Sequence, residues 1–202
     1  MKKLLPLLSL CFALLLSGFI FRPAADGYKV GDKAADFKLK NIDGKMVSLA
    51  TNKAAKGDIV VFTCNTCPYA KAYESRIMAL HQKYAPQGYP VVAINPNDPA
   101  VAPGDSYAAM QTKKYAFPYL VDATQQVART YGATRTPHLY VLTRKGNDFV
   151  VSYIGAIDDN SEDATLVKTK YVENAMTEIM AGKPASTNST KAIGCTIKWK
   201  QA

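Results

Sequence analysis

The chain has 202 residues, of which 48% are hydrophobic and 20% charged, and it carries a formal net charge of +9. This length suits one domain with additions and can bury a core without disulfide bonds. The basic residues are scattered and form no dense run interleaved with aromatic residues, so the composition argues against a nucleic-acid-binding protein.

Residues 1–25 have the order of a secretory signal peptide. Two lysines begin the segment, residues 4–20 are almost wholly apolar, and the small residues Ala24 and Ala25 follow. The alternative is an uncleaved membrane anchor, because the apolar stretch is close to the minimum length of a membrane span. We therefore expect an exported protein that is either periplasmic or tethered to the membrane through this segment, facing the periplasm.

Strand-like and helix-like segments alternate along the rest of the chain. The sequence predicts a hairpin over 37–49, with Asp43-Gly44 as its turn. The predicted strands that follow are 59–62, 90–94, 119–121, 138–142 and 149–154. The predicted helices are 68–84, 106–115, 124–131 and 162–180. This order predicts an α/β domain over 26–184, with a mixed central sheet flanked by helices, and a C-terminal tail over 185–202 that packs on it.

The motif Cys64-Asn65-Thr66-Cys67-Pro68 lies between a predicted buried strand and a predicted helix. Pro68 suits the first helical position, where its missing N–H costs nothing. Free N–H groups and the positive end of the helix dipole stabilise a thiolate at a helix start. A thiolate attacks disulfides, and a second cysteine one turn away can resolve the mixed disulfide. We therefore expect Cys64 and Cys67 to form a redox pair.

The cysteine pair has two other interpretations. A zinc site needs two further ligands, and the candidates Cys195, His81 and His138 do not pair at ligand spacing, so we expect no metal and no cofactor. A structural bridge in a non-catalytic binding module is the second interpretation. Because so short a loop removes little entropy from the unfolded chain, such a bridge would add little stability.

Several stretches together resemble the peroxiredoxin-like, thioredoxin-fold group of the AhpC/TSA (redoxin) superfamily. They are Val30-Gly31-Asp32-Lys33-Ala34-Ala35-Asp36-Phe37, the cysteine motif with Tyr69, Thr136-Pro137-His138 and Gly194-Cys195-Thr196-Ile197-Lys198-Trp199. The resemblance covers about residues 28 to 200 and implies a thioredoxin-like fold. It also implies that Pro137 is a cis proline facing the cysteine pair and that Thr136 offers backbone groups to substrate.

The same resemblance leaves peroxide reduction open as an alternative. Peroxiredoxins carry a T-x-x-C-P motif, which would make Cys67 the peroxidatic cysteine, but Cys64 stands in place of the threonine. Pro137 stands where peroxiredoxins place an arginine, with Arg135 close by as a substitute. Both departures favour thiol–disulfide exchange, in which Cys64 attacks and Cys67 resolves. The expected partners are protein or small-molecule disulfides and an unidentified thiol donor.

Cys195 lies late in the tail and has two interpretations. One is a free thiol buried beneath the tail. The other is a third redox cysteine that reaches Cys64 or Cys67, since a reactive free thiol is a liability in an exported protein.

Overall fold

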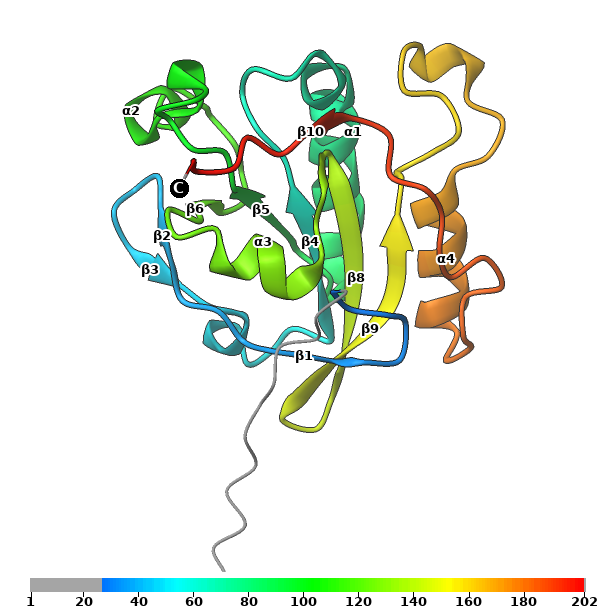
Figure 1. The fold of residues 1–202 in the computed structure, drawn as a ribbon. Coiled ribbons are helices and arrows are strands. Elements are labelled where there is room, and N and C mark those ends of the chain that lie inside the picture. The colour runs from blue at the N-terminus through cyan, green and yellow to red at the C-terminus, as the bar shows by residue number, and fades with distance from the viewer. Residues whose placement is uncertain (1–26, 202) are drawn as a thin grey trace, which may run out of the picture.

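Figure 1 shows the fold of the chain in a computed structural model, in which residues 27–201 are described. The predicted signal segment, 1–25, lies outside these residues, so its cleavage or retention as an anchor stays a prediction. Within 27–201, the structure contains no helix that is both long enough and apolar enough to cross a membrane.

The order of elements follows the predicted alternation of strands and helices. The strands are β1 (Lys33–Ala34), β2 (Leu39–Asn41), β3 (Met46–Val47), β4 (Gly57–Phe62), β5 (Val91–Asn95), β6 (Tyr119–Val121), β7 (Arg135–Thr136), β8 (His138–Lys145), β9 (Asp148–Gly155) and β10 (Cys195–Thr196). The α-helices are α1 (Pro68–Tyr84), α2 (Tyr107–Met110), α3 (Gln126–Tyr131) and α4 (Tyr171–Met180). Single 3₁₀ turns lie at Leu49–Thr51, Ala85–Gln87, Pro103–Asp105 and Ala164–Leu166.

The main sheet is mixed, as the sequence predicts. Its strand order is β1-β9-β8-β4-β5-β6-β2-β3. β4, β5 and β6 run parallel to one another, whereas β8 is antiparallel to both β4 and β9. The predicted hairpin is β2–β3, which joins the sheet edge at β6. β7 and β10 form a separate antiparallel pair.

Helices cover both faces of this sheet because its central strands are apolar on both faces. Side chains alternate between the two faces of a strand. Along β4, Ile59 and Val61 therefore pack in the cluster that contains α1 and α4, while Val60 and Phe62 pack in the cluster that contains α3. The carboxyl end of β4, where the cysteine motif begins, is thus fixed by packing on both faces of the sheet.

The predicted helix over 106–115 is wrong in length, since α2 ends at Met110. Tyr115 and Phe117 stack on one another, with ring centroids 4.8 Å apart. Residues two apart do not face each other in a helix, so the backbone over 115–117 is not helical. Directly after α2, the N–H of Lys113 donates to the Met110 carbonyl three residues back, which forms a turn and not a further α-helical bond. Phe117 is buried and packs in the core with α1.

The predicted helix over 162–180 is also too long, because α4 begins at Tyr171. The Asp159 carboxylate accepts hydrogen bonds from the backbone N–H groups of Lys168 and Thr169, both at 3.0 Å. Asp163 accepts one from the N–H of Thr165 at 2.7 Å. Such side-chain to backbone bonds satisfy groups that a helix would otherwise use, and they keep this stretch a loop.

The C-terminal tail, coloured red in Figure 1, crosses the end of the sheet beside the start of α1. It is first attached to β9, where the N–H of Ile154 donates to the Asn188 carbonyl at 3.1 Å. Strand β10 then pairs with β7. Beyond it, Ile197 is buried in the core, and Arg129 lies over the ring of Trp199, 4.4 Å from its centroid.

Candidate redox-active site

Cys64 and Cys67 lie on the loop between β4 and α1, where the sequence places them. Cys67 is the N-cap of α1 and Pro68 is the first residue of the helix. Both cysteine side chains are buried, with 6% and 4% of their surface exposed. The cysteines of residues 27–201, which are these two and Cys195, are all free thiols.

Thr136 contacts both sulfurs of the pair. Its hydroxyl lies 3.2 Å from Cys64 Sγ, and its carbonyl accepts a hydrogen bond from the Cys67 thiol at 3.2 Å. The Thr136–Pro137 peptide bond is cis. The structure therefore brings together the two sequence-predicted cysteines and the two residues predicted to meet them.

Asp105 holds the loop between the cysteines, and the sequence analysis missed it. One carboxylate oxygen accepts hydrogen bonds from the N–H groups of Asn65 at 2.6 Å and Thr66 at 3.2 Å. The other accepts from the Thr66 hydroxyl and from the Asn97 side-chain amide, both at 2.7 Å. Asp105 is 2% exposed, so its charge acts on the cysteines without intervening solvent.

A topological signal could have pointed to Asn97 and Asp105. The residues after β4 and β5 emerge at the same edge of the sheet, because these two strands are parallel. The segment 95–104 after β5 contains Pro96, Pro99 and Pro103 and continues from this edge. Polar residues in and just after that segment were therefore candidates to contact the cysteine loop.

The two thiols have pKa values shifted in opposite directions. The Cys64 thiol donates a hydrogen bond to Cys67 and lowers the pKa of Cys67, and donors from Cys195 and the Ala70 N–H add to this effect. The hydrogen bond to Cys67, burial and the nearby Asp105 charge together raise the pKa of Cys64. These causes favour a thiolate on Cys67, whereas the hydrogen bond from its thiol to the Thr136 carbonyl favours the protonated form of Cys67. The expectation that Cys64 attacks therefore stays a prediction.

Cys195 sits against the pair, and Arg135 binds the tail beside it. Cys195 lies directly opposite Thr136 in the β7–β10 pair and packs on the cluster formed by the two cysteines and Ala70. Burial raises the pKa of its thiol to about 11. Arg135 donates a 2.9 Å hydrogen bond to the Gly194 carbonyl, so its guanidinium is engaged by the tail.

The comparisons with known proteins identify the family. Residues 30–157 match the model of the AhpC/TSA family. The chain belongs to the AhpC/TSA family. A hypothetical protein from Sinorhizobium meliloti 1021 has a similar structure, with 32% sequence identity and a TM-score of 0.80 over 87% of this chain and 97% of that one.

Two further relatives of this AhpC/TSA chain are more distant. Thiol-disulfide oxidoreductase ResA of Geobacillus thermodenitrificans (strain NG80-2) is 26% identical over 126 residues, which are 58% of this chain and 65% of that relative's length. The exposed lipoprotein thioredoxin Etrx1 of Streptococcus pneumoniae strain TIGR4 is 19% identical, with a TM-score of 0.52 over 63% of this chain and 93% of that one. The latter likeness confirms the predicted thioredoxin-like fold.

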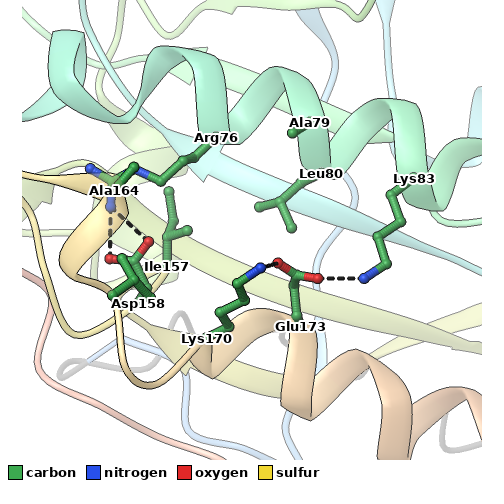
Figure 2. Close-up of a pocket in the computed structure, with 10 residues that line it drawn as sticks. Arg76, Ala79, Leu80, Lys83, Ile157, Asp158, Ala164, Lys170 and Glu173 are labelled. Carbon is green, nitrogen blue, oxygen red and sulfur yellow. Dashed lines mark hydrogen bonds and ion pairs between the residues drawn. The ribbon is translucent and has the colours of Figure 1, made fainter.

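A second polar region lies farther along α1 and contains no cysteine. A hollow of about 210 Å³ lies between α1, α4 and the loop that follows β9. Figure 2 shows residues that line it. Across it, Glu173 of α4 forms ion pairs with Lys83 of α1 and with Lys170. At its other end, Arg76 forms a 2.7 Å ion pair with Asp158.

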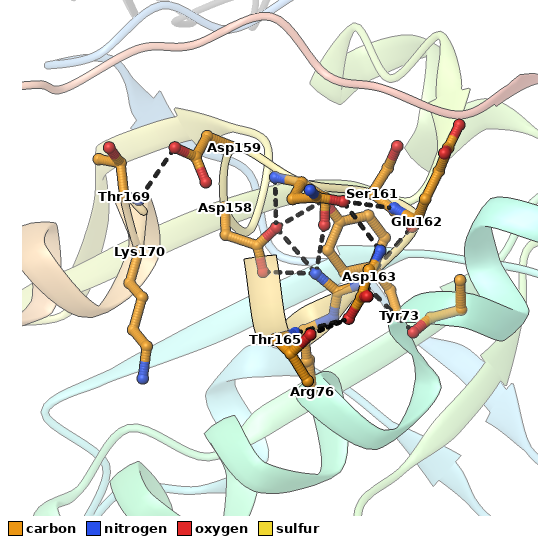
Figure 3. A network of polar contacts seen from close by, with 12 residues as sticks. Tyr73, Arg76, Asp158, Asp159, Ser161, Glu162, Asp163, Thr165, Thr169 and Lys170 are labelled. Atoms are coloured by element: carbon orange, nitrogen blue, oxygen red, sulfur yellow. Dashed lines mark hydrogen bonds and ion pairs between the residues drawn. The ribbon is translucent and has the colours of Figure 1, made fainter. Parts of the chain in front are cut away.

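The Arg76–Asp158 pair joins α1 to this loop. Figure 3 shows Asp158 surrounded by donors, among them the Tyr73 hydroxyl at 2.9 Å. Arg76 also donates to the Asn160 carbonyl at 2.6 Å. Arg76 and Asp158 pair their charges with one another, with only Arg76 Nε left without a partner in this cluster, and we assign the region a structural role.

Proposed function

We propose that this chain is a thiol–disulfide oxidoreductase that uses Cys64 and Cys67 as its redox pair. The observation that carries the proposal is that both thiols meet at Thr136, at the start of a helix, with the pKa of one of them lowered. A lowered thiol pKa supplies the thiolate that exchange requires. The relative named as a thiol-disulfide oxidoreductase supports the same chemistry.

In the proposed reaction, the Cys67 thiolate attacks one sulfur of a substrate disulfide. The substrate S–S bond breaks, and one substrate thiolate leaves and takes up a proton. Cys64 then loses its proton, attacks the Cys67 sulfur and releases the second substrate thiol. The substrate is reduced by two electrons, the pair is oxidised to a disulfide, and an external thiol donor restores it.

Reduction of insulin disulfides in the presence of dithiothreitol tests this function. We expect Cys64→Ser and Cys67→Ser each to abolish the catalysed rate, and Cys64→Ser to accumulate a mixed disulfide on Cys67. Asp148→Ala, at a half-exposed position at the start of β9, serves as the folded control. Wild-type rates in both cysteine variants would contradict the proposal and leave a non-catalytic binding module. A mixed disulfide on Cys64 in Cys67→Ser alone would assign the attack to Cys64.

Thiol peroxidase activity is a second candidate, favoured by the lowered pKa of Cys67 at the N-cap of α1. Two features weigh against peroxidase activity. Cys64 occupies the position of the threonine in the peroxiredoxin motif. Arg135, the proposed substitute for the peroxiredoxin arginine, is bound to the Gly194 carbonyl. Hydrogen peroxide consumption that is lost in Cys67→Ser and kept in Cys64→Ser would support this candidate. No consumption by the reduced wild-type chain would exclude it.

We further propose that the chain is exported through residues 1–25 and acts on disulfides outside the cytosol, with no nucleic-acid partner. The basis is the charged, apolar and small-residue order of that segment. Cell fractionation and N-terminal sequencing of the full-length chain test this proposal. Recovery in the cytosol with an intact N-terminus would contradict it, while membrane recovery with an intact N-terminus would indicate an anchor.

A further inference from the structure

The tail presents Cys195 to the redox pair through a short β-pairing. In the β7–β10 pair, Cys195 is opposite Thr136 and Thr196 is opposite Arg135. Thr136 is also the residue whose carbonyl contacts the Cys67 thiol. A segment that pairs with Thr136 in this register therefore lies beside the cysteine pair, and Cys195 packs here on the cluster of Cys64, Cys67 and Ala70.

The contact between Cys195 and Cys67 involves both the thiol and the backbone of Cys195. The Cys195 side chain and N–H help to lower the pKa of Cys67, and Cys67 in turn raises the pKa of Cys195. Cys195 packs on the cluster of Cys64, Cys67 and Ala70, and its effect on the pKa of Cys67 favours Cys67 as the sulfur that Cys195 attacks.

The approach of β10 to β7 depends on a glycine. A Cβ atom on Gly194 would lie 2.2 Å from the Thr136 carbonyl oxygen, a backbone atom that cannot move aside without breaking the site. Gly194 is also the residue whose carbonyl Arg135 binds. The glycine before Cys195 thus allows β10 to approach Thr136 closely.

Hydrogen bonds on the C-terminal side of Cys195 keep it in this register. The N–H of Ile197 donates to the Thr134 carbonyl at 3.2 Å, and the N–H of Lys198 donates to the Asn97 side chain at 2.9 Å. Asn97 in turn binds Asp105, which holds the loop between Cys64 and Cys67. The tail and the cysteine loop therefore share one hydrogen-bond network.

We propose that Cys195 is a third redox cysteine that occupies the position of a substrate thiol and forms a disulfide with Cys67, which fastens the tail over the site. This inference rests on the proposed function, which supplies the Cys64–Cys67 disulfide. The Cys195 thiol loses a proton and attacks Cys67, the Cys64–Cys67 bond breaks, and Cys64 leaves as a thiolate and takes up a proton. The exchange needs no external oxidant, and an incoming thiol reverses it.

Oxidation of the full chain, followed by acid quenching, alkylation and peptide mass spectrometry, tests the proposal. The protein is reduced, freed of reductant and treated with oxidised glutathione at low protein concentration. We expect a linked peptide pair containing Cys67 and Cys195 in the wild type, and this pair as the main product in Cys64→Ser. Glutathione or alkyl groups on both Cys67 and Cys195 in Cys64→Ser would overturn the proposal.

Two variants in the Cys64→Ser background separate docking of the tail from simple proximity. Gly194→Val removes the space that β10 needs, and we expect the yield of the Cys67–Cys195 bridge to fall about tenfold, because the local concentration of Cys195 at Cys67 falls. Arg135→Ala removes only the hydrogen bond to the Gly194 carbonyl, and we expect it to lower the yield of the bridge by less than Gly194→Val does. It also serves as a milder variant should Gly194→Val fail to fold. Bridge yields equal to those of Cys64→Ser in both variants would overturn the proposal.

Failure of this inference is distinguishable from failure of the proposed function. A wild-type chain that reduces insulin and yields only the Cys64–Cys67 disulfide would refute the role of Cys195 alone. If Cys64→Ser forms the Cys67–Cys195 bridge but the wild type reduces no insulin, the proposed function is refuted. The contact between Cys195 and Cys67 would then still stand.

Discussion

The carboxylate of Asp105 accepts a 2.6 Å hydrogen bond from the backbone N–H of Asn65, the residue that follows Cys64. The same oxygen accepts from the N–H of Thr66. Two N–H groups beside Cys64 are thus bound to a negative charge and do not stabilise a thiolate there. Together with the hydrogen bond to Cys67 and burial, this charge raises the pKa of Cys64.

Asp105→Asn should therefore lower the pKa of the Cys64 thiol, because the amide removes the charge and still accepts at one oxygen. We expect faster alkylation of Cys64 by iodoacetamide at neutral pH, measured by mass spectrometry as a function of pH. Asp98→Asn is the matched control: it makes the same charge change in the same segment, where the Asp98 carboxylate accepts from the N–H of Ala100 and does not contact the cysteine loop. An unchanged profile in Asp105→Asn would refute the electrostatic role.

The Arg76–Asp158 ion pair should contribute strongly to stability. Asp158 is 3% exposed and also binds Tyr73, so Asp158→Ala leaves the Arg76 charge without its partner in a buried position. Loss of one partner of a buried pair costs about 3–5 kcal/mol of unfolding free energy.

Urea unfolding of Asp158→Ala at pH 7 measures this loss. The matched control is Asp148→Ala, since Asp148 pairs with Lys33 at the same 2.7 Å distance but both side chains are about half exposed. We expect that control to change stability by no more than about 0.5 kcal/mol. Equal losses in the two variants would contradict the assignment of Arg76 and Asp158 as a buried pair.

Local patterns were sufficient to predict the core elements. The apolar run over 59–62 and the Pro68 start predicted β4 and α1, because burial on both faces and a free helix start are properties of a few adjacent residues. The same reasoning overextended α4. Asp159 binds N–H groups nine and ten residues away, and hydrophobic periodicity does not register such contacts.

The site was only partly predictable for the same physical reason. Cys64, Cys67 and the Thr136–Pro137 step are visible as motifs. Asp105 reaches Asn65 across 40 residues of sequence, and no motif in this chain marks that contact. The sequence does not determine whether Cys195 lies beside the cysteine pair, because its position depends on how the C-terminal tail crosses the sheet.

Asp58 should make the chain less stable as the pH rises. Its burial raises its pKa to about 7, with Arg144 opposing this shift, and one carboxylate oxygen has no hydrogen-bond partner. An aspartate titrates near pH 4 in an unfolded chain. The folded chain therefore holds a proton that the unfolded chain has lost between about pH 4 and pH 7, and stability falls as the pH rises through this window.

Asp58→Asn removes this penalty. We expect the variant to gain roughly 2–4 kcal/mol over the wild type at pH 8 and almost nothing at pH 4. Urea unfolding at the two pH values measures the difference. A constant difference between variant and wild type at both pH values would show that Asp58 is not the titrating group.

His138 should have the opposite effect on stability. Burial lowers its pKa to about 4, and its Nδ1 has no hydrogen-bond partner. An unfolded histidine binds a proton below about pH 6.5. Because the folded chain keeps His138 neutral, this residue contributes stability above about pH 6.5 and loses it as the pH falls towards 4.

The effects of Asp58 and His138 therefore oppose each other between about pH 4 and pH 6.5, and the wild-type stability curve should be shallow there. Asp58→Asn should lose stability on acidification through this window, whereas His138→Gln should gain it. His81, whose pKa burial also lowers, keeps its own contribution in both variants. Unfolding free energies at half-unit pH steps measure these slopes, and slopes of the same sign in the two variants would refute the opposition.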